Sequence, residues 1–249
     1  MQESTVHKFN NMNYFENQLR EKLTPIYSRL LENNTYENVC TFCMQWGENF
    51  PEKENDGILF VGKAVNGWIN DETDIDILFG NSEEKIFNRK DQMEWVHNHE
   101  GSENEYNTLK SAFWRVIKKV TLNFYPSENW FSFIAWSNLC KIAPFKGGNP
   151  NDGLYYEQLE NCQKILAKEI EILAPKYVIL LTSGWEKDFL YFLNGGKETK
   201  SIKKVLWNGY ETKLYKINNI NYITSQHPQG KPEEEHIETI VEIMKKHCC

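Results

Sequence analysis

The chain alternates between short unbroken apolar runs and longer segments in which apolar residues recur every three or four positions. Apolar runs at 58–62, 131–137 and 177–181 are typical of strands that are buried on both faces of a sheet. Val205–Ser225 has a different pattern, because Asn208-Gly209 and Asn218-Asn219 are hairpin-type turns that divide it into three strands. The last of these three strands is expected at 220–225.

Helical periodicity fills most of the remaining chain. A helix that ends near Phe124 is followed by Pro126, and another stops before Pro175, since proline cannot continue a helix. Asn34, with Glu37 three residues later, has the spacing of a helix cap. The pattern predicts helices at 12–33, 35–47, 109–124, 154–174, the segment ending near 193, and 232–246.

Helices that alternate with buried strands predict the α/β class. We expect a three-layer α/β/α sandwich around a central, mainly parallel four-stranded sheet. The sequence contains no repeat and no linker, and its 249 residues suit one domain. We therefore expect a single domain at 1–249, with N-terminal helices at 12–50 and a core at 57–246.

The segment 69–104 lacks sustained periodicity and is expected to be a long loop with one short helix. Between Asp71 and Glu105 there are 11 acidic residues and 3 basic ones, so this acidic insertion accounts for the formal charge of −7. The rest of the chain is close to neutral, and a local basic surface remains compatible with it. Either a phosphate-facing surface or ordinary solvated faces would explain the basic residues Lys110, Arg115, Lys118, Lys119, Lys203 and Lys204.

Composition excludes a membrane-spanning protein, because no apolar stretch approaches the roughly 20 residues that a spanning helix needs. The first residues, Met1 to Thr5, lack the basic and apolar regions of a signal peptide. We therefore expect a cytoplasmic protein without a membrane partner.

Six cysteines in such a chain indicate thiols or metal ligands rather than disulfides. Cys40 and Cys43 form a C-x-x-C pair, and with Cys140 and Cys162 they offer four ligands for an iron-sulfur cluster. Helical periodicity favours the alternative, in which Cys40, Cys43 and Cys162 lie on core-facing stripes as small buried residues. On that interpretation the protein holds no metal and no cofactor.

The loop after the first strand is polar and glycine-containing, as ligand-binding loops at sheet edges commonly are. Gly62 and Gly67 have the spacing of a phosphate-binding loop, but Trp68 and Ile69 replace the Lys and Ser or Thr that should follow. Ala64 also stands where a dinucleotide-binding loop needs its second glycine. Both nucleotide-binding motifs therefore fail.

The segments at the ends of the predicted strands resemble those of a known protein family. Four segments, in this order along the chain, carry the resemblance. They are Gly57-Ile-Leu-Phe-Val-Gly62, Trp136-Ser-Asn-Leu-Cys-Lys-Ile-Ala-Pro144, Leu173-Ala-Pro-Lys-Tyr-Val-Ile-Leu-Leu181 and Tyr222-Ile-Thr-Ser-Gln-His-Pro228. The family that they resemble is the uracil-DNA glycosylase superfamily. The run from Asn138 to Pro150 is similar to the branch that carries an iron-sulfur cluster, although the cysteine spacing departs from that branch.

The resemblance implies a site that holds a base flipped out of DNA while the bond to its sugar breaks. His227 matches the residue that stabilises the departing base anion, and Asn138 matches the residue that reads the base edge. Phe79 lies near the aromatic that stacks on the base. Each has an ordinary structural alternative: a satisfied histidine, a turn cap and a core aromatic.

The loop after Gly62 departs from active members, which place an acid or an asparagine just after the glycine to hold the attacking water. This chain has Lys63 and Ala64 there, and a lysine cation cannot accept a proton. Asn66 would position water by hydrogen bonding, with Asp74 or Asp76 as alternative bases.

Two function classes follow, both with DNA or a nucleobase-containing ligand as partner. One is a base-excision hydrolase, and the other is a catalytically silent base-binding or nucleic-acid-binding member; an unrelated α/β enzyme is a third alternative. Because parallel strands end at the same edge of a sheet, the loop from Gly62 to Asn66, Asn138 and His227 are predicted to line one pocket.

Overall fold

A computed structural model describes residues 3–51, 56–67 and 91–247. The chain forms two compact units. Unit 1 comprises residues 1–44, 63–90 and 138–174, and unit 2 comprises residues 45–62, 91–137 and 175–249. The boundary passes directly after Gly62 and between Ser137 and Asn138, so it divides the predicted site residues between the units.

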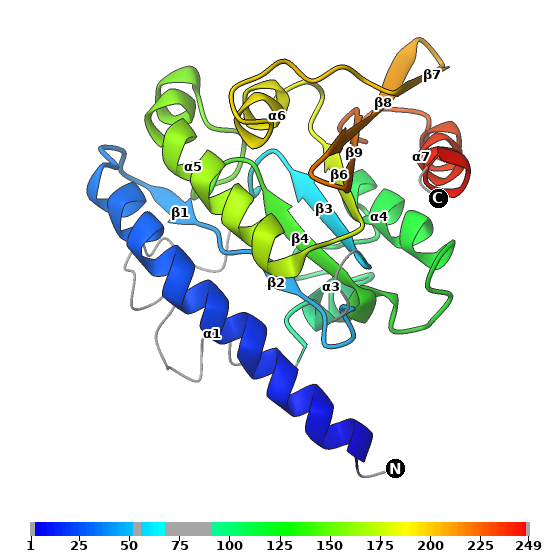
Figure 1. The fold of residues 1–249 in the computed structure, drawn as a ribbon, viewed down its shortest axis with the longest axis horizontal. Coiled ribbons are helices and arrows are strands. Elements are labelled where there is room, and N and C mark those ends of the chain that lie inside the picture. The colour runs from blue at the N-terminus through cyan, green and yellow to red at the C-terminus, as the bar shows by residue number, and fades with distance from the viewer. Residues whose placement is uncertain (1–2, 52–55, 68–90, 248–249) are drawn as a thin grey trace. The chain divides into compact units, whose positions relative to one another are not determined.

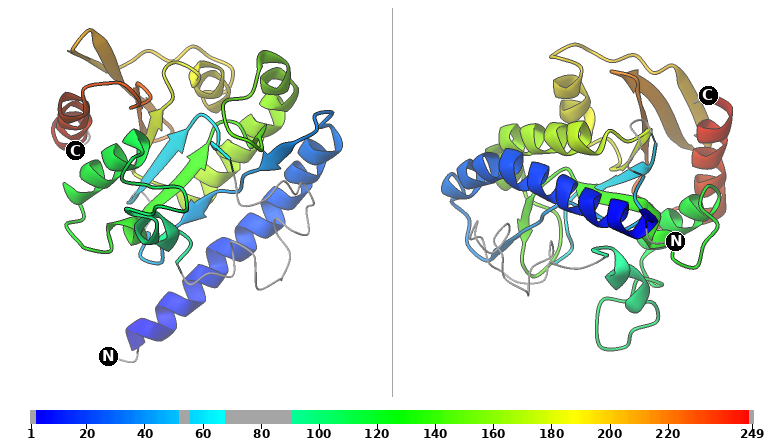
Figure 2. Two further views of the ribbon diagram at one scale, coloured as in Figure 1. Left: turned by 180° about the vertical axis from the view of Figure 1, so that it is seen from behind. Right: turned by 60° about the horizontal axis from the view of Figure 1, so that its bottom comes forward.

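Unit 1 is built on two long helices, α1 (Glu3–Glu32) and α5 (Asp152–Leu173), which lie side by side (Figure 2). Leu19, Leu23, Tyr27 and Leu30 recur at helical spacing along α1 and are buried. Helix α5 starts at the side-chain cap of Asn151, whose Oδ1 accepts from Leu154 N at 2.9 Å. It ends at Ala174, which adopts the left-handed conformation before Pro175.

The predicted helix at 35–47 is wrong. The chain instead forms β1 (Val39–Thr41) in unit 1 and β2 (Gln45–Trp46) in unit 2. The Asn34 side chain turns the chain by bonding both backbone groups of Tyr36, and Asn38 has a φ of 55°, which no helix continues. Strand β1 then pairs antiparallel with β5 (Ile142–Pro144), a partner a hundred residues away in sequence.

Unit 2 contains a seven-stranded mixed sheet in the order β2-β4-β3-β6-β9-β8-β7. The fold is therefore α/β, with a sheet larger than the four strands predicted. The strands other than β2 are β3 (Ile58–Gly62), β4 (Ile134–Asn138), β6 (Tyr177–Leu181), β7 (Lys203–Trp207), β8 (Tyr210–Ile217) and β9 (Ile220–Ser225).

The centre of this sheet is parallel and its margins are antiparallel. Strands β3, β6 and β9 run parallel, with Val61 opposite Leu180 and Leu181 opposite Ser225. Strands β7 and β8 follow antiparallel through the two predicted turns, in which Asn208 and Gly209, and Asn218 and Asn219, all have positive φ. Strand β2 is antiparallel to β4.

The helices of unit 2 are short or lie at the margin of the sheet. They are α3 (Glu94–Asn98), α4 (Ala112–Leu122), the 3-10 helix η2 (Trp130–Phe133), α6 (Lys187–Leu193) and α7 (Glu233–His247). Helix α7 packs on α4 and on the β7–β8 hairpin (Figure 1). Helix η2 occupies the start of the predicted strand at 131–137, so that strand begins only at Ile134. None of the described helices is both long and apolar enough to cross a membrane.

Candidate functional site

The carboxyl edge of the parallel strands in unit 2 carries Gly62, the Thr182–Gly184 turn and the loop that holds His227. Gly62 ends β3, and the register of β3, β6 and β9 places the ends of all three strands at one edge. The turn after β6 is tied to β9, because Thr182 N and Ser183 N both donate to Ser225 O, at 3.2 and 3.1 Å. Two of the predicted site segments therefore share the edge expected for a ligand site.

His227 is held in a defined position on this edge. Its backbone N–H donates to Ser183 Oγ at 2.7 Å, and its ring lies parallel to that of Phe113 with centroids 6.0 Å apart. Gln229 N donates to His227 Nδ1 at 3.4 Å, which fits the tautomer that carries its proton on Nε2. The side chain remains partly exposed. The imidazole is thus held in place and partly exposed.

A network of buried polar side chains includes Ser225, the last residue of β9. We call Trp207, Thr212, Ser225 and His236 the unit 2 network. Trp207 Nε1 donates to Thr212 Oγ1 at 2.9 Å, Thr212 Oγ1 lies 2.7 Å from Ser225 Oγ, and Ser225 Oγ lies 2.8 Å from His236 Nε2. The His236 ring stacks on Trp207 at 4.5 Å. Burial, aided by His227 and Lys231, lowers the pKa of His236 to about 4, so this histidine is neutral near pH 7.

The loop after Gly62 belongs to unit 1 and is fixed to the chain that follows Asn138. Lys63 O accepts from Cys140 N at 2.8 Å, and Asn66 Oδ1 accepts from Gly148 N at 2.9 Å. Gly147, next to the Asn66 side chain, has a φ of 94°, a conformation that favours glycine. The exposed Asn66 retains acceptor capacity for water, whereas Ala64 and Lys63 are partly buried.

Asn138, the last residue of β4, is buried, and its Nδ2 has no hydrogen-bond partner among the residues described. A buried amide donor without a partner is costly, and such groups call for an explanation by a ligand, a water or function. An amide that offers a donor at this position fits the base-reading role that the resemblance gives it.

Several of the predicted site residues are not brought together by these observations. Phe79, Asp74 and Asp76 lie outside the described residues. Gly62 and His227 belong to unit 2, whereas Lys63, Ala64, Asn66 and Asn138 belong to unit 1. The prediction that they line one pocket therefore stays a prediction.

The four described cysteines are free, buried and confined to unit 1. Cys40 and Cys43 lie in and just after β1, so the helical stripe assigned to them is wrong, although both side chains are in the core. Cys40 Sγ donates to Ala143 O, and Cys162 Sγ donates to Gln158 Oε1. Burial raises the pKa of Cys43 and Cys140 well above the usual range and that of Cys162 to about 12.

An iron-sulfur cluster needs several cysteine side chains that converge on one point. Over residues 3–51, 56–67 and 91–247, no group of three or more His, Cys, Asp or Glu side chains is arranged to hold a metal ion. The described residues of unit 1 therefore do not fit the cluster found in the branch that the sequence resembles.

A buried ion pair lies among these thiols, and we call Tyr27, Cys43, Lys141, Cys162 and Glu169 the unit 1 cluster. Lys141 Nζ lies 2.9 Å from both carboxylate oxygens of Glu169, and both side chains have no exposed surface. Lys141 N donates to Cys162 Sγ, and Tyr27 donates to Phe42 O. Sequence reasoning missed this pair, because nothing in the local pattern distinguishes a buried lysine from an exposed one.

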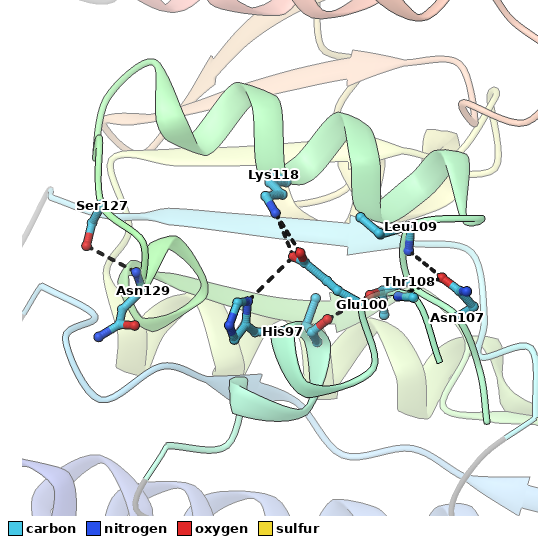
Figure 3. Close-up of polar contacts among 10 residues, drawn as sticks. His97, Glu100, Asn107, Thr108, Leu109, Lys118, Ser127 and Asn129 are labelled. Atoms are coloured by element: carbon cyan, nitrogen blue, oxygen red, sulfur yellow. Dashed lines mark hydrogen bonds and ion pairs between the residues drawn. The ribbon is translucent and has the colours of Figure 1, made fainter. Parts of the chain in front are cut away.

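The basic residues proposed to face phosphates divide into two groups. On α4, Lys118 contacts Glu100 at 2.7 Å, and Figure 3 shows this pair beside His97, between α4 and the described end of the acidic insertion. Arg115 and Lys119 both pair with Glu233 at 2.8 Å. Lys203 and Lys204 lie instead on the β7–β8 hairpin. The basic face of α4 is therefore largely neutralised.

The comparisons with known proteins assign no family. No family model matches the sequence, and no curated protein matches it.

Proposed function

We propose that the protein is a divergent uracil-DNA glycosylase-like hydrolase that acts on a base flipped out of DNA. The observation that carries the proposal is the placement of His227 at the carboxyl end of β9, with its backbone held by Ser183. Strands β4, β3, β6 and β9, adjacent in that order, would be the four central strands of a three-layer core of that type.

The reaction breaks the bond between sugar C1′ and a base nitrogen, whose electron pair leaves with the base. Water then adds to C1′, and its proton ends on the base or on a nearby acceptor. The Nε2–H of His227 would donate to the base oxygen on which negative charge develops. Asn138 Nδ2, which has no hydrogen-bond partner among the described residues, would donate to the edge of the base.

A second candidate, a silent base-binding member, is favoured by Lys63. A cation in the place of the acid that holds water removes the general base and disfavours the positive charge that builds on the sugar. Asn66 can orient a water through Oδ1 but cannot take its proton. We therefore expect excision to be slow and base binding to persist.

The test is a gel assay for base release from labelled single- and double-stranded oligonucleotides that carry uracil, hypoxanthine or other altered bases. A parallel binding assay compares the same oligonucleotides with unmodified ones. We expect H227A and N138A to lose base-dependent binding at least tenfold, since each removes a donor to the base. The matched control is H97A, a half-exposed histidine of α3 that stacks on Phe131.

Lys63→Asp separates the two candidates. If Lys63 silences an otherwise complete site, K63D gains base release relative to wild type. Release by the wild-type protein that is abolished by H227A and N138A would support the hydrolase. Base release or base-dependent binding that survives both substitutions would overturn the whole proposal.

A further inference from the structure

The β7–β8 hairpin and the segment leading into it concentrate positive charge in an acidic protein. Residues 197–216 contain six lysines and two glutamates, in a chain whose formal charge is −7. Strand β7 forms an edge of the seven-stranded sheet, and its first two residues, Lys203 and Lys204, are exposed. The hairpin is therefore a basic projection at the margin of unit 2.

The acidic residues near the hairpin do not neutralise it. Lys204 and Lys213 both pair with Glu211. Lys200, Lys203 and Lys216 are exposed and have no acidic partner in the described portion of the chain. This differs from α4, where Arg115, Lys118 and Lys119 are all paired with carboxylates.

The strand register divides the lysines of the hairpin between its two faces. Lys204 lies directly opposite Lys213 in the antiparallel β7–β8 pair, so the two cations share one face of the sheet. Like charges directly opposite one another destabilise a strand pair. The Glu211 carboxylate contacts both of these cations and raises the pKa of Lys213, which offsets the repulsion. Lys203 and Lys216 lie on the other face of the hairpin, where no carboxylate among the described residues pairs with them.

We propose that the β7–β8 hairpin binds the phosphate backbone of DNA. Lysines spaced along two strands present several point charges to a polyanion, and each lysine that neutralises a phosphate releases condensed counterions. The choice of DNA as the polyanion rests on the proposed function, whereas the anion-binding surface rests on the charges of the hairpin. Such contacts position a protein on DNA and carry no sequence information.

Fluorescence anisotropy with an unmodified labelled duplex, measured over a range of salt concentrations, tests this surface. The variant K200Q/K203Q/K216Q removes three unpaired lysines. The slope of log Kobs against log salt should fall by about 0.9 for each phosphate that the variant no longer neutralises, and therefore by roughly 1 to 3. The matched control, K164Q/K168Q/K246Q, removes the same charge from lysines that are each paired with a glutamate on their own helix, and its slope should change little.

Glu211→Gln provides a gain-of-binding arm. It releases Lys204 and Lys213 from their shared carboxylate, so the affinity for the duplex should rise severalfold and the slope should steepen. Equal losses in the hairpin and control variants would overturn the proposal, as would unchanged binding in E211Q. Binding of a polyglutamate peptide as tightly as the duplex would overturn the assignment to DNA.

The duplex carries no altered base, so the result is independent of base recognition. A hairpin variant that loses DNA binding while no altered base is bound or released would leave this inference standing and refute the proposed function. If an altered base is bound or released but the hairpin variant binds the unmodified duplex as tightly as wild type, the proposed function stands and this inference is refuted.

Discussion

The two units bury polar groups in contrasting ways. The unit 1 cluster buries an ion pair, in which Lys141 Nζ contacts both carboxylate oxygens of Glu169 and neither side chain has exposed surface. The unit 2 network holds a histidine that is equally buried, but no carboxylate contacts it in the described structure, and it stays neutral. The two buried groups differ in what their neighbours offer: an opposite charge in the unit 1 cluster, and only neutral hydrogen-bonding groups in the unit 2 network.

The largest effect should come from breaking the charge balance of the unit 1 cluster. Glu169→Gln leaves the Lys141 ammonium buried beside a neutral amide, and the loss of stability should be about 3 to 5 kcal/mol. Chemical denaturation of the purified protein measures it. The double variant K141M/E169Q removes both charges and should recover much of the loss; if it is as unstable as E169Q, the charge explanation is wrong.

The contribution of the unit 2 network to stability should depend on pH, because His236 titrates differently in the folded and unfolded states. The folded pKa of His236, about 4, lies below the ordinary value of 6.5. Above pH 6.5 His236 is neutral in both the folded and the unfolded protein, and its contribution to the free energy of unfolding is fully present. As the pH falls from 6.5 to 4, His236 becomes protonated in the unfolded protein but stays neutral in the folded one, so the folded state loses stability. The stability lost across this window should be about 3 kcal/mol.

Thermal or urea unfolding between about pH 7.5 and 4 measures this loss. H236Q removes the titrating group and should flatten that part of the profile. His97, which is half exposed, provides the control H97Q, which should leave the profile unchanged. An identical profile in H236Q and in wild type would contradict the prediction.

A smaller effect is expected from the neutral hydrogen bonds of the same network. Thr212→Val keeps the shape of the side chain but leaves the buried Trp207 Nε1–H without its acceptor, at a cost of about 1 to 3 kcal/mol. Thr121→Val in α4 is the matched control: its hydroxyl donates only to Ile117 O, which keeps its helical surroundings. The T212V loss should exceed the T121V loss in urea unfolding.

The smallest effect should come from the exposed counterpart of the buried ion pair. Lys118→Gln breaks a pair with Glu100 that is partly exposed, and it should cost about 1 kcal/mol or less. Added salt should shrink the difference further, because it screens exposed charges. A loss as large as that of E169Q would show that exposure does not separate the two pairs.

Local pattern in the sequence determined most of the elements. The apolar runs predicted β3, β6 and β9, the Asn-Gly and Asn-Asn turns predicted the β7–β9 meander, and helical periodicity with Pro175 predicted α5. These signals are local, since burial on both faces, a positive φ and a missing N–H each depend on a few neighbouring residues. The position of His227 just after a buried strand was readable for the same reason.

Only the tertiary structure decided what depends on distant partners. Residues 35–47 have helical spacing, but β1 forms because Val39–Thr41 pairs with Ile142–Pro144. The same lysine side chain is buried against Glu169 at position 141, paired with Glu100 at 118 and without an acidic partner among the described residues at 203. Burial and charge pairing are set by residues far apart in the chain, and so no local pattern encodes them.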